Sequence, residues 1–329
     1  MNEVETKDVG TTDLSAYMMK VIEELRRARK PPAVHIYTCT LRSFIRFSDN
    51  GEEECSMPMQ EVFTPGRLKE YEQWMLLRKL TQNTISTYMR TLRAVYNRWM
   101  PPGTAEHNPR LFDDVYTGVV SQTKRALTAR QMEQLLEADL SGLSPQQQAV
   151  LAYFLLMFLL RGMPFIDLAH LRKRDMQDGR ITYSRHKPIT VRIPREALAL
   201  IAKYADRHSA SPYLFPILDA RIRDGWQSYR NYQDALRHFN RKLGQVMSRL
   251  LPGVRVSSYT ARHTWATLAF HSGQPVGIIS QALGHSSLRV TETYLKPFGN
   301  ELVDKANRQL IASVRKCKWK NETEYRAGL

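Results

Sequence analysis

A segment near the C-terminus, Ser258 to Phe298, gathers the residue types that can cleave a phosphodiester. It contains Arg262 followed by His263, a Leu-Gly-His run that ends at His285, and Tyr294 nine residues later. A phenol can attack phosphorus and leave again, an arginine can bind two non-bridging oxygens, and a histidine can donate a hydrogen bond or carry a proton. These residues therefore predict covalent chemistry on a nucleic-acid backbone.

A lysine elsewhere in the chain could protonate the leaving alcohol. Residues 180–194 alternate apolar and polar side chains around a turn at 184–188, which predicts a β-hairpin with Lys187 in its turn. From there the lysine could reach a minor groove and give its proton to the leaving oxygen. Each candidate alone has a plainer explanation, since such a tyrosine usually packs in a core, a histidine after glycine caps a helix and a turn lysine is solvated.

The elements that must position these residues are mostly helices. In the N-terminal part, helical periodicity begins near Asp13, and Pro31-Pro32 is expected to stop that first helix. A second helix over about 34–47 is expected to turn Ile36, Leu41, Phe44 and Ile45 inward. Further helices are expected from Thr64-Pro65 and from Thr81 to Trp99. The N-terminal part therefore reads as a compact helical module.

A second domain is predicted after a stretch rich in Pro, Gly, Asn and Thr. It opens with the capping box Thr128 to Gln131 and contains a nearly all-apolar helix over about 145–160. The expected organisation is a disordered N-terminus at 1–12, a helical domain at 13–100, a linker at 101–126, a catalytic domain at 127–316 and a tail at 317–329.

The charge balance favours a polyanionic partner. The chain has 329 residues, enough for two domains, with 48 Lys+Arg against 32 Asp+Glu and a formal net charge of +16. Such a surface binds nucleic acid because each phosphate contact releases condensed counterions. A basic surface that serves only solubility is the plainer alternative.

Cysteine usage and the N-terminal residues favour the cytoplasm. Cys39, Cys55 and Cys317 are widely spaced and form no CxxC or Cys/His cluster, so we expect no disulfide, no metal site and no cofactor. The first residues are acidic and polar, unlike a secretory signal, and the apolar run 149–160 is too short to span a bilayer. We therefore expect no membrane partner and a location in the bacterial cytoplasm, on the nucleoid.

The spacing of the motifs resembles the catalytic signature of the tyrosine recombinases, the phage integrase family. The matching runs are Arg-His-Thr-Trp-Ala-Thr at 262–267, Gly273, Leu-Gly-His-Ser-Ser at 283–287 and Thr-Glu-Thr-Tyr at 291–294. The likeness covers nearly the whole chain. It implies a mostly α protein, with a helical, SAM-like core-binding domain and an α-rich catalytic domain that holds a small antiparallel β-sheet, the DNA breaking-rejoining fold.

The same resemblance implies a role for each matching residue. Tyr294 corresponds to the nucleophile, Arg262 to the second catalytic arginine and His285 to the late histidine. The hairpin at 181–187 is similar to the one that carries the family's catalytic lysine, which makes Lys187 the general acid. His263, beside Arg262, is expected to support the site.

The chain departs from the family pattern at the first catalytic arginine, where Pro164 stands instead. Asp167 matches the acidic position that follows. Arg161 lies three residues before the proline, across a glycine that we expect to end one helix before the next begins. We hypothesise that the Arg161 side chain fills the space of the usual arginine; alternatively, it only satisfies the carbonyls at the end of its own helix.

A second departure is Tyr259, which stands where the family has the histidine of its His-x-x-Arg box. A tyrosine hydroxyl can donate a hydrogen bond to a phosphate oxygen, but it cannot act as a cation near neutral pH. We therefore expect Tyr259 to position the phosphate and to leave proton transfer to His285 and Lys187. A competing role as nucleophile is the alternative for Tyr259.

The family's activity implies site-specific DNA recombination. A 3′-phosphotyrosyl link would form at Tyr294 and free a 5′-hydroxyl, and a partner strand would reverse the bond without metal or ATP. Four active sites would be needed, which implies a homotetramer on two double-stranded DNA sites, with a possible accessory DNA-bending protein. A first domain that starts near residue 13 leaves no room for an arm-binding domain, which favours an invertase or mobile-element integrase acting on inverted repeats.

An apolar stripe follows the tyrosine over Asn300 to Lys316. Such a stripe usually packs inside its own chain, but in this family a C-terminal helix commonly docks on a neighbouring subunit. We expect a partner-docking helix. Two rival functions remain: a type IB topoisomerase, which uses the same tyrosine chemistry but rejoins the same strand, and a catalytically degenerate DNA-binding protein, suggested by Pro164 and Tyr259.

Overall fold

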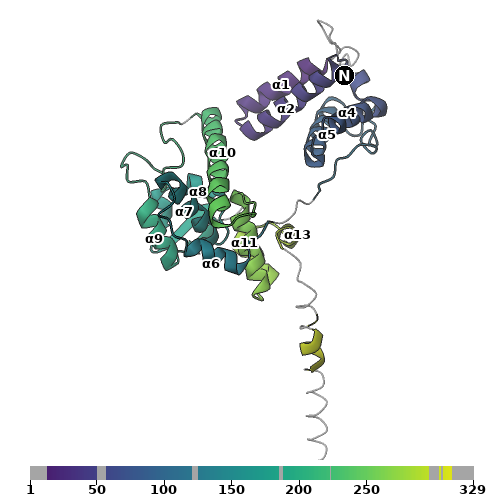
Figure 1. Cartoon of the computed structure of the whole chain (residues 1–329). Helices are drawn as coiled ribbons and strands as arrows, with labels where there is room; N and C mark the ends of the chain where they lie inside the picture. The colour runs from purple at the N-terminus through teal and green to yellow at the C-terminus, as the bar shows by residue number, and fades with distance from the viewer. Residues whose placement is uncertain are drawn as a thin grey trace, which may run out of the picture. The chain divides into compact units, whose positions relative to one another are not determined.

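The computed structural model describes residues 13–49, 57–120, 125–184, 188–222, 224–295, 304 and 307–312. These residues form helices and one small antiparallel sheet, so the predicted mostly α fold is confirmed. The contacts divide the chain into two units (Figure 1). One comprises Met1–Gln122 with Ile222–Asn231, and the other comprises Thr123–Arg221 with Tyr232–Leu329.

The first unit is built from helices whose starts are set by side-chain caps. Asp13 accepts hydrogen bonds from the backbone at Ser15, at 2.8 Å, and Thr81 accepts one from Thr84, at 3.3 Å. The first helix ends at Arg27, before Pro31, and Pro31 occupies the first turn of the next helix, where its missing N–H costs nothing. The helices are α1 (Leu14–Arg27), α2 (Pro31–Ser48), α3 (Met59–Val62), α4 (Pro65–Leu77) and α5 (Gln82–Trp99).

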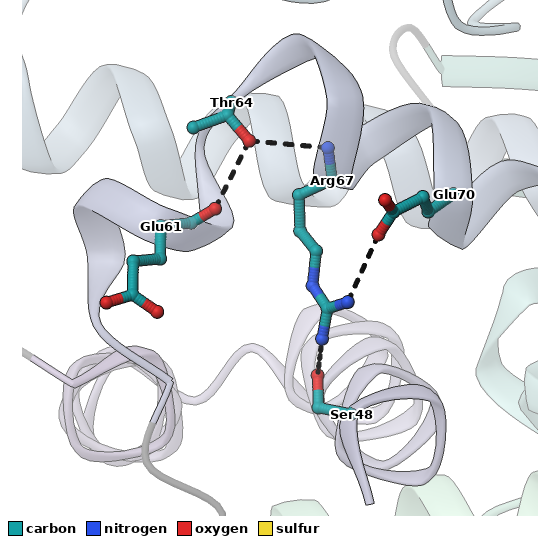
Figure 2. A network of polar contacts seen from close by, with 5 residues as sticks. All are labelled: Ser48, Glu61, Thr64, Arg67 and Glu70. Carbon is teal, nitrogen blue, oxygen red and sulfur yellow. Dashed lines mark hydrogen bonds and ion pairs between the residues drawn. The ribbon is translucent and has the colours of Figure 1, made fainter. Parts of the chain in front are cut away.

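A polar network joins the end of α2 to the start of α4 (Figure 2). The Thr64 hydroxyl donates to the Glu61 carbonyl and accepts from the Arg67 backbone, both at 3.3 Å, which fixes the first turn of α4. The Arg67 guanidinium then donates to Glu70 at 3.2 Å and to the Ser48 hydroxyl at 3.3 Å. One arginine thereby connects two helices of the unit.

The chain after α5 packs onto the first unit, although the sequence suggested a linker from residue 101. Leu111, Phe112 and Val115 are buried in the same core as the helices. The buried Glu72 carboxylate accepts from the Tyr116 backbone at 2.6 Å, and the Asn83 amide pairs with both backbone groups of Val120, at 2.9 and 3.1 Å. The first compact unit therefore includes residues as far as 120.

The second unit surrounds one apolar helix. The predicted capping box is present, since Thr128 and Gln131 bond each other's backbone. Helix α7 buries most of its length because its residues are apolar on all sides. The helices are α6 (Ala129–Leu136), α7 (Pro145–Leu159), α8 (Phe165–His170), α9 (Arg195–Tyr204), the part of α10 (Gly225–Leu250) from Tyr232 onward, α11 (Ser258–His271), α12 (Val276–Leu283) and α13 (Leu288–Glu292).

The predicted hairpin is present as β2 (Arg180–Ser184) and β3 (Pro188–Arg192), paired antiparallel with Ile181 opposite Val191. A short strand, β1 (Met176–Gln177), adds to the other edge of β2 in the order β1-β2-β3. Ile181 and Val191 are buried in the core of this unit, so the sheet has one packed face. Within the described residues, no helix is both long and apolar enough to cross a membrane.

Candidate active site

Arg262 lies at the centre of the candidate site. It comes from the buried face of α11 and is only 1% exposed. Its guanidinium donates to the carbonyl oxygen of Gly162 at 2.9 Å and to that of Leu283 at 2.6 Å. A buried cation needs such acceptors, because an unpaired charge in a protein interior is strongly disfavoured. The ends of α7 and α12 therefore hold the arginine from two sides.

His285 is delivered to this arginine by the end of α12. Gly284 takes a left-handed conformation, with φ of 68°, and the His285 backbone N–H bonds the Ser280 carbonyl at 3.1 Å, which closes the helix. The imidazole Nε2 then lies 3.0 Å from an Arg262 nitrogen, and Nδ1 lies 2.9 Å from the Thr291 hydroxyl. Because arginine can only donate, Nε2 must accept, and Nδ1 carries the proton that it donates to Thr291.

Tyr294 lies along one face of α11, on the side chains of Tyr259, His263 and Thr267. These residues are four apart, so they share a face of the helix. The Tyr294 hydroxyl lies 2.7 Å from the Tyr259 hydroxyl, and the Tyr294 carbonyl oxygen lies 3.4 Å from both His263 Nδ1 and the Thr267 hydroxyl. The tyrosine is thus held at both ends.

The Tyr294 ring is enclosed by aromatic and cationic groups. Its centroid lies 4.8 Å from each of the imidazole rings of His263 and His285, and the Arg262 guanidinium carbon lies 5.4 Å from it. The ring of Tyr259 stacks at 5.9 Å with an interplanar angle of 26°. As a result Tyr294 is only 9% exposed, whereas Tyr259 is 49% exposed.

The turn between α7 and α8 brings Arg161 next to the arginine centre. Arg161 and Gly162 both have left-handed backbones, with φ of 61° and 68°. A Cβ on Gly162 would lie 3.1 Å from the Arg262 Cα, so the two backbones approach as closely as a glycine permits. Arg161 is half-buried, and within the described residues its guanidinium has no hydrogen-bond partner.

Backbone groups close the end of α7. The N–H of Met163 bonds the Met157 carbonyl at 2.9 Å, and the N–H of Gly162 bonds the Phe158 carbonyl at 3.4 Å. These two carbonyls therefore do not need the Arg161 side chain. Asp167 lies in the first turn of α8, three residues after Pro164.

Strands β2 and β3 flank Lys187 in the sequence, and β3 packs against the residue before His285. Residues 185–187 lie outside the described residues, so the position of Lys187 itself stays a prediction. The strand that follows it places Ile189 against Gly284, where any Cβ would overlap the Ile189 side chain. The hairpin thus approaches the site at the residue before His285.

The sequence pointed to five of the residues that the structure brings together: Tyr259, Arg262, His263, His285 and Tyr294. It did not point to the carbonyl oxygens of Gly162 and Leu283. Thr267 and Thr291 were part of the matching motifs, but no role was expected for their hydroxyls. Among the described residues, no group of three or more His, Cys, Asp or Glu side chains could hold a metal ion.

Comparison with known proteins decides the family. The sequence pattern of the phage integrase family matches residues 125–301, more than half of the chain, and that of the phage integrase SAM-like domain matches residues 13–113. The chain belongs to the phage integrase family. It is a tyrosine-type site-specific recombinase, as the resemblance implied.

Named relatives support this assignment, and solved structures share the fold. The chain is 23% identical to the tyrosine recombinase XerC of Halalkalibacterium halodurans over 85% of this chain and 91% of that protein. It is 26% identical to the tyrosine recombinase XerA of Pyrococcus furiosus over 56% of this chain and 62% of that protein. The fold resembles that of the Tn1549 transposon integrase in complex with transposon right end DNA, with a TM-score of 0.63, 15% identity and coverage of 91% and 100%. It also resembles a lambda integrase dimer bound to a core site, with a TM-score of 0.61, 14% identity and coverage of 88% and 97%.

Proposed function

We propose that this integrase-family protein cleaves one DNA strand by attack of the Tyr294 hydroxyl on the scissile phosphate. A 3′-phosphotyrosyl bond forms, the bond from phosphorus to the 5′ oxygen breaks, and a 5′-hydroxyl is released. The hydroxyl of a partner strand then reverses the reaction. The observation that carries the proposal is the convergence of Arg262, His285 and Tyr294 within one chain, with Arg262 bonded to His285 at 3.0 Å and its guanidinium carbon 5.4 Å from the Tyr294 ring.

Arg262 is the proposed cation for the charge that develops on the phosphate. Its carbonyl partners fix the guanidinium before the reaction, and a preorganised charge stabilises a transition state without further rearrangement. Arg262 is buried, and the Tyr294 ring lies 5.4 Å from its guanidinium carbon, so a shift of this ring would open the arginine to a phosphate. We propose that DNA binding causes this shift.

We propose Arg161 as the second cation. Support comes from its place next to Gly162, whose carbonyl holds Arg262, and from the backbone closure of α7, which leaves the Arg161 guanidinium free of a capping role. In this proposal Arg161 replaces the arginine that the family carries at the position of Pro164. Asp167 is proposed to support the same turn.

Lys187 is the proposed general acid for the leaving 5′ oxygen. Support comes from the contact of Ile189, two residues after the lysine, with Gly284, the residue before His285. The proton donors of the site are then Lys187 and, once it separates from Arg262, His285. Neither the attack nor the proton transfer in this scheme requires a metal ion or ATP.

A basic pocket in the first unit is the proposed site of DNA backbone contact. It is about 460 Å³ in volume and includes the exposed Arg42, Arg46 and Arg78. Arg42 and Arg46 are one helical turn apart, and like charges at this spacing repel each other unless an anion lies between them. The Arg78 guanidinium stacks on the Trp74 ring at 4.2 Å, which keeps it extended.

We further propose a homotetramer on two double-stranded sites with inverted repeats, and DNA inversion or mobile-element integration as the outcome. An accessory DNA-bending protein belongs to the same proposal. The predicted docking helix at 300–316 lies mostly outside the described residues. Its described part, residue 304 and residues 307–312, is helical and exposes the apolar Leu310 and Ile311, which favours docking on a partner.

A plasmid that carries two copies of a candidate site tests the recombination. Inverted repeats close to the coding sequence supply the candidate sites. We expect the purified full chain to invert the segment between two inverted sites, and a Tyr294→Phe variant to leave it unchanged. Relaxation of supercoils on a plasmid without any site would instead indicate a topoisomerase, and binding without cleavage would indicate a degenerate DNA-binding protein.

A further inference from the structure

Helix α11, which bears Arg262, is held from two sides. On one side Arg262 donates to the carbonyl oxygens of Gly162 and Leu283. Thr264 follows two residues later, and side chains two apart on a helix project roughly 200° from each other, so it lies on the opposite side. There α11 faces the core of the second unit, where Ala261 is fully buried. The position of the arginine therefore depends on what α11 contacts on both sides.

Thr264 is a polar side chain on the core-facing side of α11. It is fully buried, and its hydroxyl oxygen accepts a hydrogen bond of 2.9 Å from the backbone N–H of Leu127, 137 residues earlier in the chain. Valine has nearly the same shape and would fill this space without a polar group to satisfy. The hydroxyl is explained by its partner, because without it the buried N–H of Leu127 would lose this acceptor.

Leu127 lies in a well-fixed part of the second unit. It precedes Thr128, whose capping box with Gln131 fixes the first turn of α6. Leu127 and Met132 occupy the two positions of a hydrophobic staple on either side of that turn, and both are buried in the same core. Because the start of α6 is fixed by its own contacts, a hydrogen bond to Leu127 gives α11 a fixed point.

We propose that Thr264 is a positioning residue for Arg262. Its hydrogen bond to Leu127 anchors α11 to the start of α6, and this anchor determines where α11 presents the guanidinium to the scissile phosphate. Thr264 acts through the arginine and not by contact with DNA. The inference rests on the proposed function, in which Arg262 stabilises the charge on the phosphate, and it adds a requirement on the far side of the arginine's helix.

The first test compares Thr264→Val, which removes the acceptor, with Thr264→Ser, which keeps it. Single-turnover formation of the covalent adduct is measured for the full chain on a nicked duplex that carries the recombination site. We expect Thr264→Val to react about 10- to 100-fold more slowly with unchanged DNA affinity, since small displacements of a catalytic group have effects of this size. Thr264→Ser should react at close to the wild-type rate.

Thr91→Val is the matched control. Thr91 is a buried threonine of the first unit, and its hydroxyl donates to a carbonyl of its own helix, α5, at 2.8 Å. Its replacement by valine makes the same chemical change without affecting a contact between two elements. We expect this control to form the adduct at the wild-type rate.

The second test asks whether the defect depends on the charge of the phosphate. A methylphosphonate, with a methyl group in place of one non-bridging oxygen, has no negative charge at the scissile position, so its cleavage relies much less on a well-placed cation. We expect most of the Thr264→Val defect to disappear on this substrate. A defect of the same size on both substrates would mean that Thr264 acts on a part of the site other than Arg262, and would overturn the proposal.

Thermal unfolding is measured for every variant, and rates are compared well below the lowest unfolding temperature. If Thr264→Val does not fold, Thr264→Cys takes its place, because a thiol is a weaker hydrogen-bond acceptor of similar size. Its adduct should then form more slowly than that of Thr264→Ser. Equal rates in these two variants would contradict the proposal.

The outcomes also separate the anchor from the proposed function. If the wild type forms an adduct and Thr264→Val forms it at the same rate, the anchor is not needed and the cleavage mechanism stands. A parallel loss of DNA affinity and rate in Thr264→Val would also overturn the proposal, because the hydrogen bond would then support the fold and not Arg262 alone. Failure of the wild type to form any adduct would contradict the proposed function itself.

Discussion

The carbonyl oxygen of Gly162 accepts a hydrogen bond of 2.9 Å from Arg262, 100 residues further along the chain. The contact favours a residue without a side chain, because a Cβ on Gly162 would lie within a tight 3.1 Å of the Arg262 Cα and 3.3 Å of Leu283 Cδ2. The position also has a φ of 68°. The turn after α7 is therefore shaped around Arg262, the proposed catalytic arginine.

Gly162→Ala is predicted to displace Arg262 and reduce cleavage on the order of 100-fold, since small misplacements of a catalytic group have effects of this size. Gly179→Ala is the matched control, because Gly179 has the same φ of 68° and a Cβ added there would meet nothing within 4 Å. Both variants should lose about 1–2 kcal/mol of stability from the left-handed backbone. The cleavage rate and the thermal unfolding temperature measure the two effects. Equal cleavage rates in the two variants would show that Gly162 does not position Arg262.

Arg161→Ala is predicted to lower the cleavage rate by about 100- to 1,000-fold while DNA binding persists, as expected for loss of a transition-state charge. Arg29→Ala is its control, because Arg29 is another left-handed arginine at a helix end, with φ of 52°. Single-turnover adduct formation on a nicked site is the measurement. If Arg161→Ala formed the adduct at the same rate as the control, Arg161 would not be the second cation.

Thr291→Val should weaken both the fold and the chemistry. Thr291 is fully buried and its hydroxyl lies 2.9 Å from Nδ1 of the half-buried His285, so the isosteric change removes this hydrogen bond, at a cost of about 0.5–1.5 kcal/mol. The released imidazole can then take either tautomer, which should slow cleavage. Thr293→Val, at an exposed neighbouring position, is the control. Unchanged thermal unfolding and cleavage in Thr291→Val would refute the assigned tautomer.

The double variant Arg42→Ala with Arg46→Ala should weaken DNA binding and make it less dependent on salt. Each lost phosphate contact lowers the slope of log affinity against log salt by about 0.9, so we expect a decrease of about 1–2. Titration of a site-bearing duplex at several salt concentrations measures the slope. Arg110→Ala, an exposed arginine outside the pocket, is the control, and an equal slope in the two proteins would exclude the pocket as a phosphate site.

The starts of the helices were readable because capping is local. Helix starts were expected near Asp13, Thr64 and Thr81, and these residues cap α1, α4 and α5. The inward face of α2 was less readable: Leu41 and Phe44 are buried, but Ile36 and Ile45 are exposed. Periodicity gives the width of an apolar face, whereas the neighbouring helices determine how much of it is covered.

The residue types of the site could be predicted, but their mutual arrangement could not. The residue types and the motif spacing indicated Arg262, His285 and Tyr294. In the structure, each of them lies on or just after a separate helix. The carbonyl acceptors of Arg262 carry no sequence signal, because every residue has a carbonyl group. The contact between Tyr259 and Tyr294 joins residues 35 apart and depends on how α11 packs against the chain after α13. The residue type at position 259 suggested a contact with the phosphate. The contact of Tyr259 with Tyr294 is visible only in the three-dimensional arrangement.

The central claim, that Tyr294 is the nucleophile, is tested most directly by the covalent protein–DNA adduct. Wild type and Tyr294→Phe are incubated with a nicked duplex that carries the site, and the adduct is digested and mapped by mass spectrometry. The account predicts an adduct in the wild type with a phosphonucleotide on Tyr294, and none in Tyr294→Phe. An adduct that persists in Tyr294→Phe, or that maps to Tyr259, would contradict it.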